Sequence, residues 1–258
     1  MPKAFTRAVS PRIAECALTH LDRQPIDPDR AAAQHDAYEK ALRDAGFDVI
    51  RLPELANDPD AVFVEDTAIL LGEHAIITRP GAPSRTGETL STAVGLTPYF
   101  KIHYLSGGTL DGGDVLQIEN TLYVGQSSRT DGAGTKALEA VASPLGYWVV
   151  PVELDRCLHL KTAVTFAGLD DQGVPTIVVN PDWVDPAQFA DVQEIWVPEN
   201  EPFAANVVRA GDRLIMAAGS IETVALLRQR GFKVVEVDVS ELQKAEAGGT
   251  CMSLIADG

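Results

Sequence analysis

The chain has 258 residues, of which 45% are hydrophobic, and a formal net charge of −16. This composition suits one large globular domain or two smaller ones, and no run approaches the roughly 20 apolar residues that a membrane-spanning helix requires. The negative charge repels phosphate backbones and argues against a nucleic-acid partner, while three cysteines without a CxxC pair argue against a disulfide framework and a structural zinc site.

Three stretches share a helix that runs into a strand across a glycine. Each has apolar residues at helical spacing, then a glycine and an aromatic residue, then a run rich in β-formers. The stretches are ALRDAGFDVIRLPEL (41–55), ALEAVASPLGYWVVPVEL (137–154) and LLRQRGFKVVEVDVSEL (226–242). We expect Gly46, Gly146 and Gly231 to follow the helix ends, where the chain needs a left-handed conformation.

Between these stretches lie four predicted hairpins. In each, an apolar run meets a short polar turn and then a second apolar run, and the turns are GEH, EN, GLDDQG and AGD. The hairpins are predicted over residues 61–80, 112–128, 159–180 and 206–220.

The combined unit is therefore strand, strand, helix, strand, and it recurs about four or five times. No linker rich in Gly, Ser or Pro divides the chain, so we expect one domain, residues 1–258, built by radial repetition. An open α/β sheet is the alternative. It explains the tight hairpins less well.

Acidic residues flank and interrupt the first apolar run, DPDAVFVEDTAIL (58–70). If this run is a strand, the adjacent Glu65 and Asp66 point to opposite faces, and we expect one of them to face inward. A buried carboxylate must be paired with a cation or with hydrogen-bond donors, because burying an unpaired charge costs on the order of several kcal/mol. Asp60 lies just before the run, and solvated acids at a strand end are the alternative.

A glycine-rich stretch, GGTLDGGDVLQ (107–117), surrounds Asp111 and Asp114. Glycine permits a tight turn or the close approach of a ligand. A turn in which an aspartate caps backbone amides is the alternative. The stretch does not match a phosphate-binding loop, because no lysine or helix start follows at the required spacing.

A histidine and a cysteine occur together in RCLHLKTAV (156–164). We expect His159 to open an apolar strand, either as a general base or as an inert, partly buried residue. Cys157 lies two residues earlier, on the same face of such a strand, so the two could be a nucleophile and its base. A buried cysteine that acts as a small hydrophobic residue is the more common case.

The remaining candidate is Cys251, which follows Gly248, Gly249 and Thr250 near the end of the chain. The glycines leave room for a substrate to approach the sulfur. The apolar MSLI that follows predicts a final strand that holds this thiol in the fold. A structural free cysteine is the alternative.

Taken together, these stretches resemble the dimethylarginine dimethylaminohydrolases, a family of guanidino-group-modifying enzymes. The resemblance runs from Leu18 to Cys251 and depends on the order and spacing of its motifs. The motifs are DAVFVEDTA (60–68), Arg85, LDGGDVL (110–116), VGQSSRT (124–130), HLKT (159–162) and GGTCMSL (248–254).

The resemblance implies a five-bladed α/β propeller of ββαβ repeats, the pentein fold, with the site at its centre. It implies Cys251 as the nucleophile, His159 as general acid and base, and Asp111 as the residue that orients His159. Asp114 is then structural.

The resemblance also implies how a substrate is held. Asp66 would hold the guanidinium, and the guanidinium forks of Arg85 and Arg129 would clamp the substrate carboxylate. The other implied substrate contacts are a lid that contains Leu18, the acids Asp60 and Glu65, and the backbone of Ala245.

The implied reaction is hydrolysis of Nω-methylated arginine to citrulline and a methylamine through a covalent cysteine thiouronium intermediate. It needs no metal or organic cofactor, and its partner is a small cationic substrate. Because the first residues carry charges and lack an apolar signal core, we expect a cytoplasmic protein without membrane contact. A homodimer is compatible with the sequence.

Two alternatives stay open. Arginine deiminases typically carry His-x-Asp, whereas this chain has His159-Leu160-Lys161, which favours a methylated arginine over arginine. A propeller that binds large assemblies without chemistry is the alternative from another class, but such a module has no need for the full set of acids, histidine and cysteine.

Overall fold

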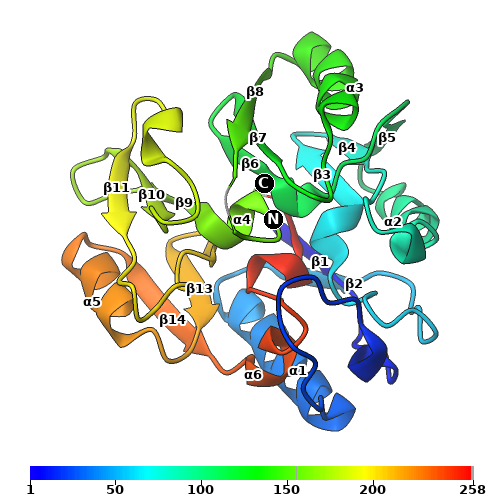
Figure 1. The fold of residues 1–258 in the computed structure, drawn as a ribbon, viewed down its shortest axis with the longest axis horizontal. Coiled ribbons are helices and arrows are strands. Elements are labelled where there is room, and N and C mark those ends of the chain that lie inside the picture. Colours follow the sequence, from blue (N-terminus) through cyan, green and yellow to red (C-terminus); the bar gives the residue numbers. More distant parts are fainter. Residues whose placement is uncertain (155, 257–258) are drawn as a thin grey trace.

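The structure is a computed structural model that describes residues 1–154 and 156–256. Within these residues the strands form five three-stranded sheets, arranged around a common centre as the blades of a propeller (Figure 1). In every blade the first strand pairs antiparallel with the second, and the second pairs parallel with the third. The predicted five-bladed α/β propeller is therefore confirmed.

Blade 1 joins the two ends of the chain. Strand β1 (Lys3–Thr6) pairs parallel with β2 (Asp48–Arg51) and antiparallel with β15 (Leu254–Ala256). Helix α1 (Pro28–Asp44) connects β1 to β2. The predicted final strand is thus confirmed, and it closes the ring of blades.

The other blades follow the chain in order. Blade 2 contains β3 (Ala68–Leu71), β4 (His74–Ile77), α2 (Glu88–Leu96) and β5 (Lys101–Tyr104). Blade 3 contains β6 (Val115–Ile118), β7 (Thr121–Gln126), α3 (Gly132–Ala142) and β8 (Trp148–Glu153). Blade 4 contains β9 (Val164–Leu169), β10 (Pro175–Val179) and β11 (Gln193–Trp196). Blade 5 contains β12 (Val207–Ala210), β13 (Arg213–Ala217), α5 (Ile221–Gln229) and β14 (Lys233–Val237).

The predicted glycine positions are confirmed. Gly46, Gly146 and Gly231 have φ values of 94°, 90° and 85°, and each follows a helical segment and precedes a strand. A residue with a Cβ adopts this left-handed conformation only at a cost, so glycine ends the helix cleanly at these points. Blade 4 differs, because a short 3-10 turn (Pro186–Gln188) replaces the α-helix between its last two strands.

The strand predicted across residues 61–70 is partly wrong. A 3-10 turn (Val64–Thr67) occupies its middle, and β3 begins only at Ala68. The carbonyl of Phe63 accepts a hydrogen bond from Arg85 at 2.7 Å, and the hydroxyl of Thr67 donates to the carbonyl of Val64 at 2.7 Å. These local partners replace the ladder bonds of a strand, so Glu65 and Asp66 are both buried instead of facing opposite ways.

The strand predicted to open at His159 is also wrong at its start. His159 has extended backbone angles and precedes a four-residue helix, α4 (Leu160–Ala163), and β9 starts at Val164. The carboxylate of Asp114 accepts from the backbone N–H of Leu160 at 2.9 Å. A carboxylate that satisfies a free N–H stabilises a helix start at this point.

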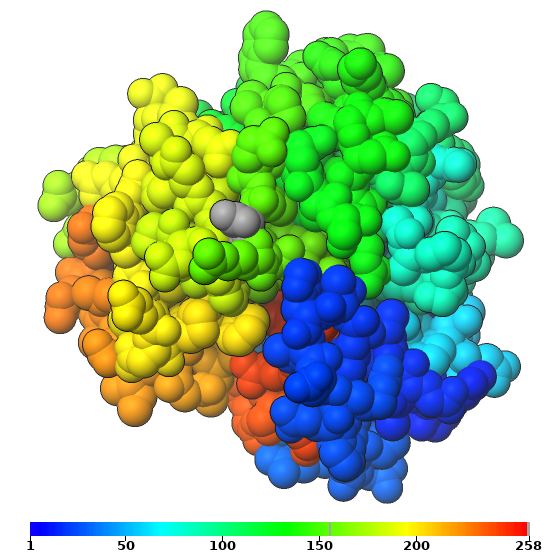
Figure 2. All heavy atoms as spheres, in the orientation of Figure 1, coloured from blue at the N-terminus to red at the C-terminus, as the bar shows by residue number. Residues whose placement is uncertain are grey.

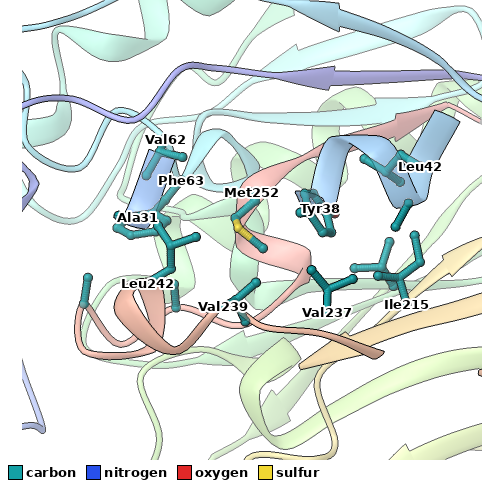
Figure 3. Packing of buried hydrophobic residues seen from close by; sticks show 14 of the residues in the cluster. Ala31, Tyr38, Leu42, Val62, Phe63, Ile215, Val237, Val239, Leu242 and Met252 are labelled. Carbon is teal, nitrogen blue, oxygen red and sulfur yellow. The ribbon is translucent and has the colours of Figure 1, made fainter. Parts of the chain in front are cut away.

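A core beneath the C-terminal segment fixes the position of the terminal cysteine. Met252 is fully buried between α1 and the short helix α6 (Ser240–Gln243), and it packs in one cluster with Tyr38 and Leu242 (Figure 3). The hydroxyls of Tyr38 and Ser253 share a hydrogen bond of 2.7 Å. Met252 and Ser253, which follow Cys251 directly, are therefore anchored in the core.

None of the helices in residues 1–154 and 156–256 combines the length and the apolar character needed to cross a membrane.

Candidate active site

The predicted site residues converge at the centre of the propeller, around a cavity of about 30 Å³. Seven of them line this cavity: Asp60, Asp66, Arg85, Arg129, His159, Ala245 and Cys251. The other three do not line the cavity themselves. Asp111 is hydrogen-bonded to His159, and Glu65 and Leu18 are the sequence neighbours of the lining residues Asp66 and Ala17.

Two adjacent carboxylates occupy the 3-10 turn before β3, and both are buried. Glu65 pairs with the ammonium of Lys161 at 2.6 Å and accepts from the hydroxyl of Thr250 at 2.8 Å. Burial nevertheless raises the pKa of Glu65. Burial would also raise the pKa of Asp66, but the charges of His159 and Arg85 outweigh it and lower that pKa. Asp66 is therefore ionised in the site.

The glycines of the DGGD motif let the chain pass close to these groups. A Cβ at Gly113 would lie 2.7 Å from Oδ1 of Asp66 and 2.8 Å from Nδ1 of His159. The backbone N–H of Gly113 donates to Asp66 at 3.0 Å. The motif thus places a backbone donor where no side chain has room.

His159 is held between carboxylates. Its Nε2 lies 3.0 Å from Oδ2 of Asp111, and its Nδ1 lies 3.9 Å from Oδ1 of Asp66. Burial alone would lower the pKa of His159, but the charges of Asp66 and Asp114 and the hydrogen bond with Asp111 raise it to about 9. The ring is therefore an imidazolium at neutral pH.

Asp114 organises the loops around the histidine. It accepts from the hydroxyls of Ser127 and Thr130, each at 2.6 Å, and from the N–H of Leu160 at 2.9 Å. Burial raises its pKa to about 6 against these hydrogen bonds and the charge of His159. The VGQSSRT motif thus supplies partners for this one carboxylate.

Cys251 lies in a 3-10 turn (Thr250–Met252), and its sulfur accepts from the N–H of Gly248 at 3.4 Å. Asn206 holds the turn, because its side chain accepts from the N–H of Thr250 at 3.0 Å and donates to the Thr250 hydroxyl at 3.0 Å. Burial, together with the charges of Glu65 and Asp66, raises the pKa of the Cys251 thiol to about 12.

Cys157, the thiol close to His159 in sequence, lies outside the central cavity. Cys157 lines a neighbouring cavity of about 350 Å³ and donates to the backbone carbonyl of His159 at 3.5 Å. This contact involves the main chain of His159 and not its ring. The arrangement of Cys157 and His159 as a nucleophile and base on one strand face is therefore wrong.

Comparison with known proteins agrees with this geometry. A family model described as N,N dimethylarginine dimethylhydrolase, eukaryotic, matches residues 18–168, more than half of the chain. A relative from Streptomyces coelicolor, named N(G),N(G)-dimethylarginine dimethylaminohydrolase, is 41% identical and the match covers 98% of this chain and 96% of the relative. A protein of the same name from Pseudomonas aeruginosa is 35% identical over 92% of this chain and 91% of its own.

The chain belongs to the dimethylarginine dimethylaminohydrolase family. A solved structure from Pseudomonas aeruginosa, a cysteine-to-serine variant complexed with citrulline, superposes with a TM-score of 0.91 at 33% identity and 99% coverage of both chains. The pentein fold expected for this family is thus the fold of this chain.

Arg85 and Arg129, the two arginines of the site, differ in how much of their charge is paired within the protein. Arg85 forms ion pairs with Asp66 and with Glu88, the latter at 2.8 Å, and donates to a backbone carbonyl. Arg129 lies 4.0 Å from Asp111 and donates to the hydroxyl of Thr19 at 3.0 Å. Arg129 is therefore the guanidinium with more freedom to meet another anion.

Sequence reasoning missed two charged partners of the site. Glu88 neutralises Arg85, and only its position three residues later, at the start of α2, would have suggested the pairing. The sequence places Lys161 where deiminases carry an aspartate, and in the structure its ammonium pairs with Glu65. That pairing joins residues far apart in sequence, so no local pattern predicts it.

One group of potential metal ligands occurs within residues 1–154 and 156–256. Donor atoms of Asp66, Asp111 and His159 lie within 4.8 Å of one another. Asp66 is already paired with Arg85, and Asp111 accepts from the N–H of Gly81 at 2.7 Å. The positive charge of Arg85 beside this group disfavours a metal cation, and the absence of a cofactor stays a prediction.

Proposed function

We propose that this protein hydrolyses Nω-methylated arginine to citrulline and a methylamine, with Cys251 as nucleophile. The observation that carries the proposal is the convergence of Cys251, His159 and Asp66 on one central cavity, with Asp111 behind the histidine. The family relatives named for this reaction support it, as does the citrulline bound by the Pseudomonas aeruginosa variant.

Substrate charge is central to the proposed chemistry. Burial is the main cause of the raised pKa of the Cys251 thiol, and the charges of Glu65 and Asp66 add to it. A substrate guanidinium placed against these carboxylates would offset their contribution and favour the thiolate. The thiol then loses its proton to solvent and becomes a thiolate. The thiolate forms a bond to the central guanidinium carbon, which the carboxylates hold in place.

The charged ring of His159 serves the next step as an acid. It gives its proton to the methylated nitrogen as the bond from this nitrogen to carbon breaks, which releases the methylamine and leaves a thiouronium on Cys251. His159, now neutral, takes a proton from water as the oxygen bonds to the same carbon. The carbon–sulfur bond then breaks, which yields citrulline and the free cysteine.

We assign the remaining contacts as follows. Arg129 and Arg85 attract the substrate carboxylate, Asp60 and the carbonyl of Ala245 face its ammonium, and Leu18 belongs to the segment that covers it. Lys161 stands where deiminases carry an aspartate and is bound to Glu65. No carboxylate there selects an unmethylated guanidinium, which supports a methylated substrate.

Three broader proposals concern the domain organisation, the localisation and the kind of partner. The chain acts as one domain in the cytoplasm, on a small cation and not on nucleic acid, and the net charge of −16 is consistent with such a substrate. A homodimer stays a prediction that sedimentation of the purified protein would test.

The deciding experiment measures citrulline release from dimethylarginine, monomethylarginine and arginine in parallel. We expect release from the methylated substrates, its loss in Cys251→Ser, and near-normal activity in the matched thiol control Cys157→Ala. Release from arginine alone would assign the chain to the deiminases. No release from any of the three, by a folded protein, would overturn the proposed function.

A further inference from the structure

Residues 17–21, here called the cover segment, begin in the wall of the central cavity and continue along the neighbouring one. Ala17 lines the cavity of about 30 Å³ together with Cys251 and Glu246. On the face drawn in Figure 2, the dark blue N-terminal chain lies over the red C-terminal part of the molecule. A cavity of this volume holds about one or two water molecules, so part of its wall must open before an amino acid can reach Cys251.

One carboxylate binds most of this segment. The two oxygens of Glu246 each accept from the N–H of Thr19 at 3.0 Å, and one of them also accepts from His20 at 2.5 Å and Leu21 at 2.6 Å. Three consecutive backbone donors thus converge on a single side chain that lies 225 or more positions away in the sequence. Hydrogen bonds to an ionised acceptor are stronger than neutral ones.

The backbone conformation of Glu246 is also unusual. Glu246 has φ of 60°, which places a residue with a Cβ in the left-handed region. It follows helix α6 and lies beside Ala245, which also lines the cavity. Strained residues of this kind persist where the surrounding structure fixes them, often at functional sites. The residue in this conformation is the one whose carboxylate binds the cover segment.

Two further groups bind the cover segment, and both already have a role in the proposed function. Asp60 accepts from the N–H of Ala17 at 3.1 Å, and Arg129 donates to the hydroxyl of Thr19. Glu246 differs, because no motif of the sequence pointed to it. It also lines the neighbouring cavity of about 350 Å³, together with His20 and Leu21. Displacing the cover segment would therefore bring the two cavities together.

We propose that Glu246 is a positioning residue that holds the cover segment closed over Cys251 and so controls access to the thiol. Where the inference concerns substrate, it rests on the proposed function. Loss of the carboxylate frees three backbone donors and shifts the cover segment toward its open state. The thiol then becomes more accessible, and the bound substrate is held less tightly.

The test compares Glu246→Ala with a matched control on blade 5. Glu201 also accepts from two backbone N–H groups, those of Glu222 and Thr223, each at 2.8 Å, at the start of α5. Glu201→Ala removes a similar set of hydrogen bonds away from the cavity. A third variant, Glu246→Gly, removes the side chain but relieves the left-handed backbone, so it remains informative if Glu246→Ala folds poorly.

Two readouts are independent of turnover. The rate of Cys251 alkylation by iodoacetamide, followed by peptide mass spectrometry, should rise about tenfold in Glu246→Ala and Glu246→Gly, as expected for a closing free energy of the size of one charged hydrogen bond. Hydrogen exchange of the amides of residues 19–21 should accelerate in the same variants. Glu201→Ala should leave both rates unchanged.

Turnover provides the third readout. We expect KM for methylated arginine to rise about tenfold in the Glu246 variants with little change in kcat, because closure stabilises the bound state. Wild-type alkylation and exchange rates in both Glu246 variants, or an equal change in Glu201→Ala, would overturn the inference. If the rates change as expected but no protein releases citrulline, Glu246 still holds the cover segment and only the proposed function fails.

Discussion

The thiol of Cys251 and the ring of His159 have pKa values displaced in the same direction. Burial and the charges of Glu65 and Asp66 raise the pKa of the thiol to about 12, and neighbouring carboxylates raise that of His159 to about 9 against its burial. At neutral pH the site therefore holds a neutral thiol and an imidazolium. Under the proposed function, the imidazolium would protonate a leaving amine, and a cationic substrate would raise the thiolate fraction above its low value in the free protein.

The raised thiol pKa makes a direct prediction for the free protein. Alkylation of Cys251 by iodoacetamide should increase about tenfold per pH unit between pH 6.5 and 8.5, because only the thiolate reacts and its fraction grows in this proportion below the pKa. Quantifying the Cys251 peptide by mass spectrometry measures the rate, with the Cys157 peptide as an internal reference for the reagent. A plateau within this range would show that the thiol is already ionised.

The carboxylate of Asp111 is predicted to act through His159. Asp111→Asn keeps a hydrogen-bond partner for the ring but removes the charge that helps to raise the pKa of His159. We expect kcat to fall by about 100-fold, the lower range for general acid–base catalysis, with KM nearly unchanged. Steady-state kinetics and an NMR titration of the His159 ring would test this. A large rise in KM at unchanged kcat would instead assign Asp111 to substrate binding.

At the scale of elements, the sequence was informative where structure is local. The glycines after the helices and the polar turns of the hairpins act through nearby backbone geometry, so their positions were predictable. The 3-10 turn at Val64–Thr67 was not, because Arg85, some twenty residues later, binds the carbonyl of Phe63. The contacts of Glu246 with residues 19–21 escaped prediction for the same reason.

Helix α1 carries a buried histidine that the proposed reaction does not use. His35 is 1% exposed and its Nδ1 lies 3.8 Å from Glu39, while its Nε2 has no hydrogen-bond partner among residues 1–154 and 156–256. Burial lowers its pKa from 6.5 to about 4. Burial would raise the pKa of Glu39, but hydrogen bonds from Arg51 and Thr6 lower it to about 2.

These shifts predict how acid unfolds the protein. Between pH 6.5 and 4 the unfolded chain binds a proton at His35 that the folded chain does not, so stability falls as pH decreases through this window. The loss amounts to about 3 kcal/mol at most, from about 1.4 kcal/mol per pKa unit. Urea unfolding at several pH values should show a shallower dependence in His35→Gln than in the exposed control His20→Gln. Equal slopes would contradict the shift.

At the scale of the whole molecule, the ring is closed by its two ends. Strand β15 pairs with β1, so the segment that carries Cys251 is held by the first residues of the chain. Leu254, 5% exposed, packs with Phe5 of blade 1 and with Val64, Ala68 and Ile77 around blade 2. Because each blade contacts its neighbours around the centre, we expect the ring to unfold as one unit.

Leu254→Ala tests this closure. Removing a buried leucine side chain should lower the free energy of unfolding by about 3 kcal/mol. The chain has three tryptophans, Trp148, Trp183 and Trp196, all in the part of the sequence that forms blades 3 and 4 and far from Leu254 in the chain. If the propeller is one cooperative domain, tryptophan fluorescence and far-ultraviolet circular dichroism should give the same shift in urea midpoint. A dichroism midpoint that shifts while the fluorescence midpoint stays at its wild-type value would mean that blades 3 and 4 unfold independently of the closing strand, and the ring would then consist of more than one folding unit.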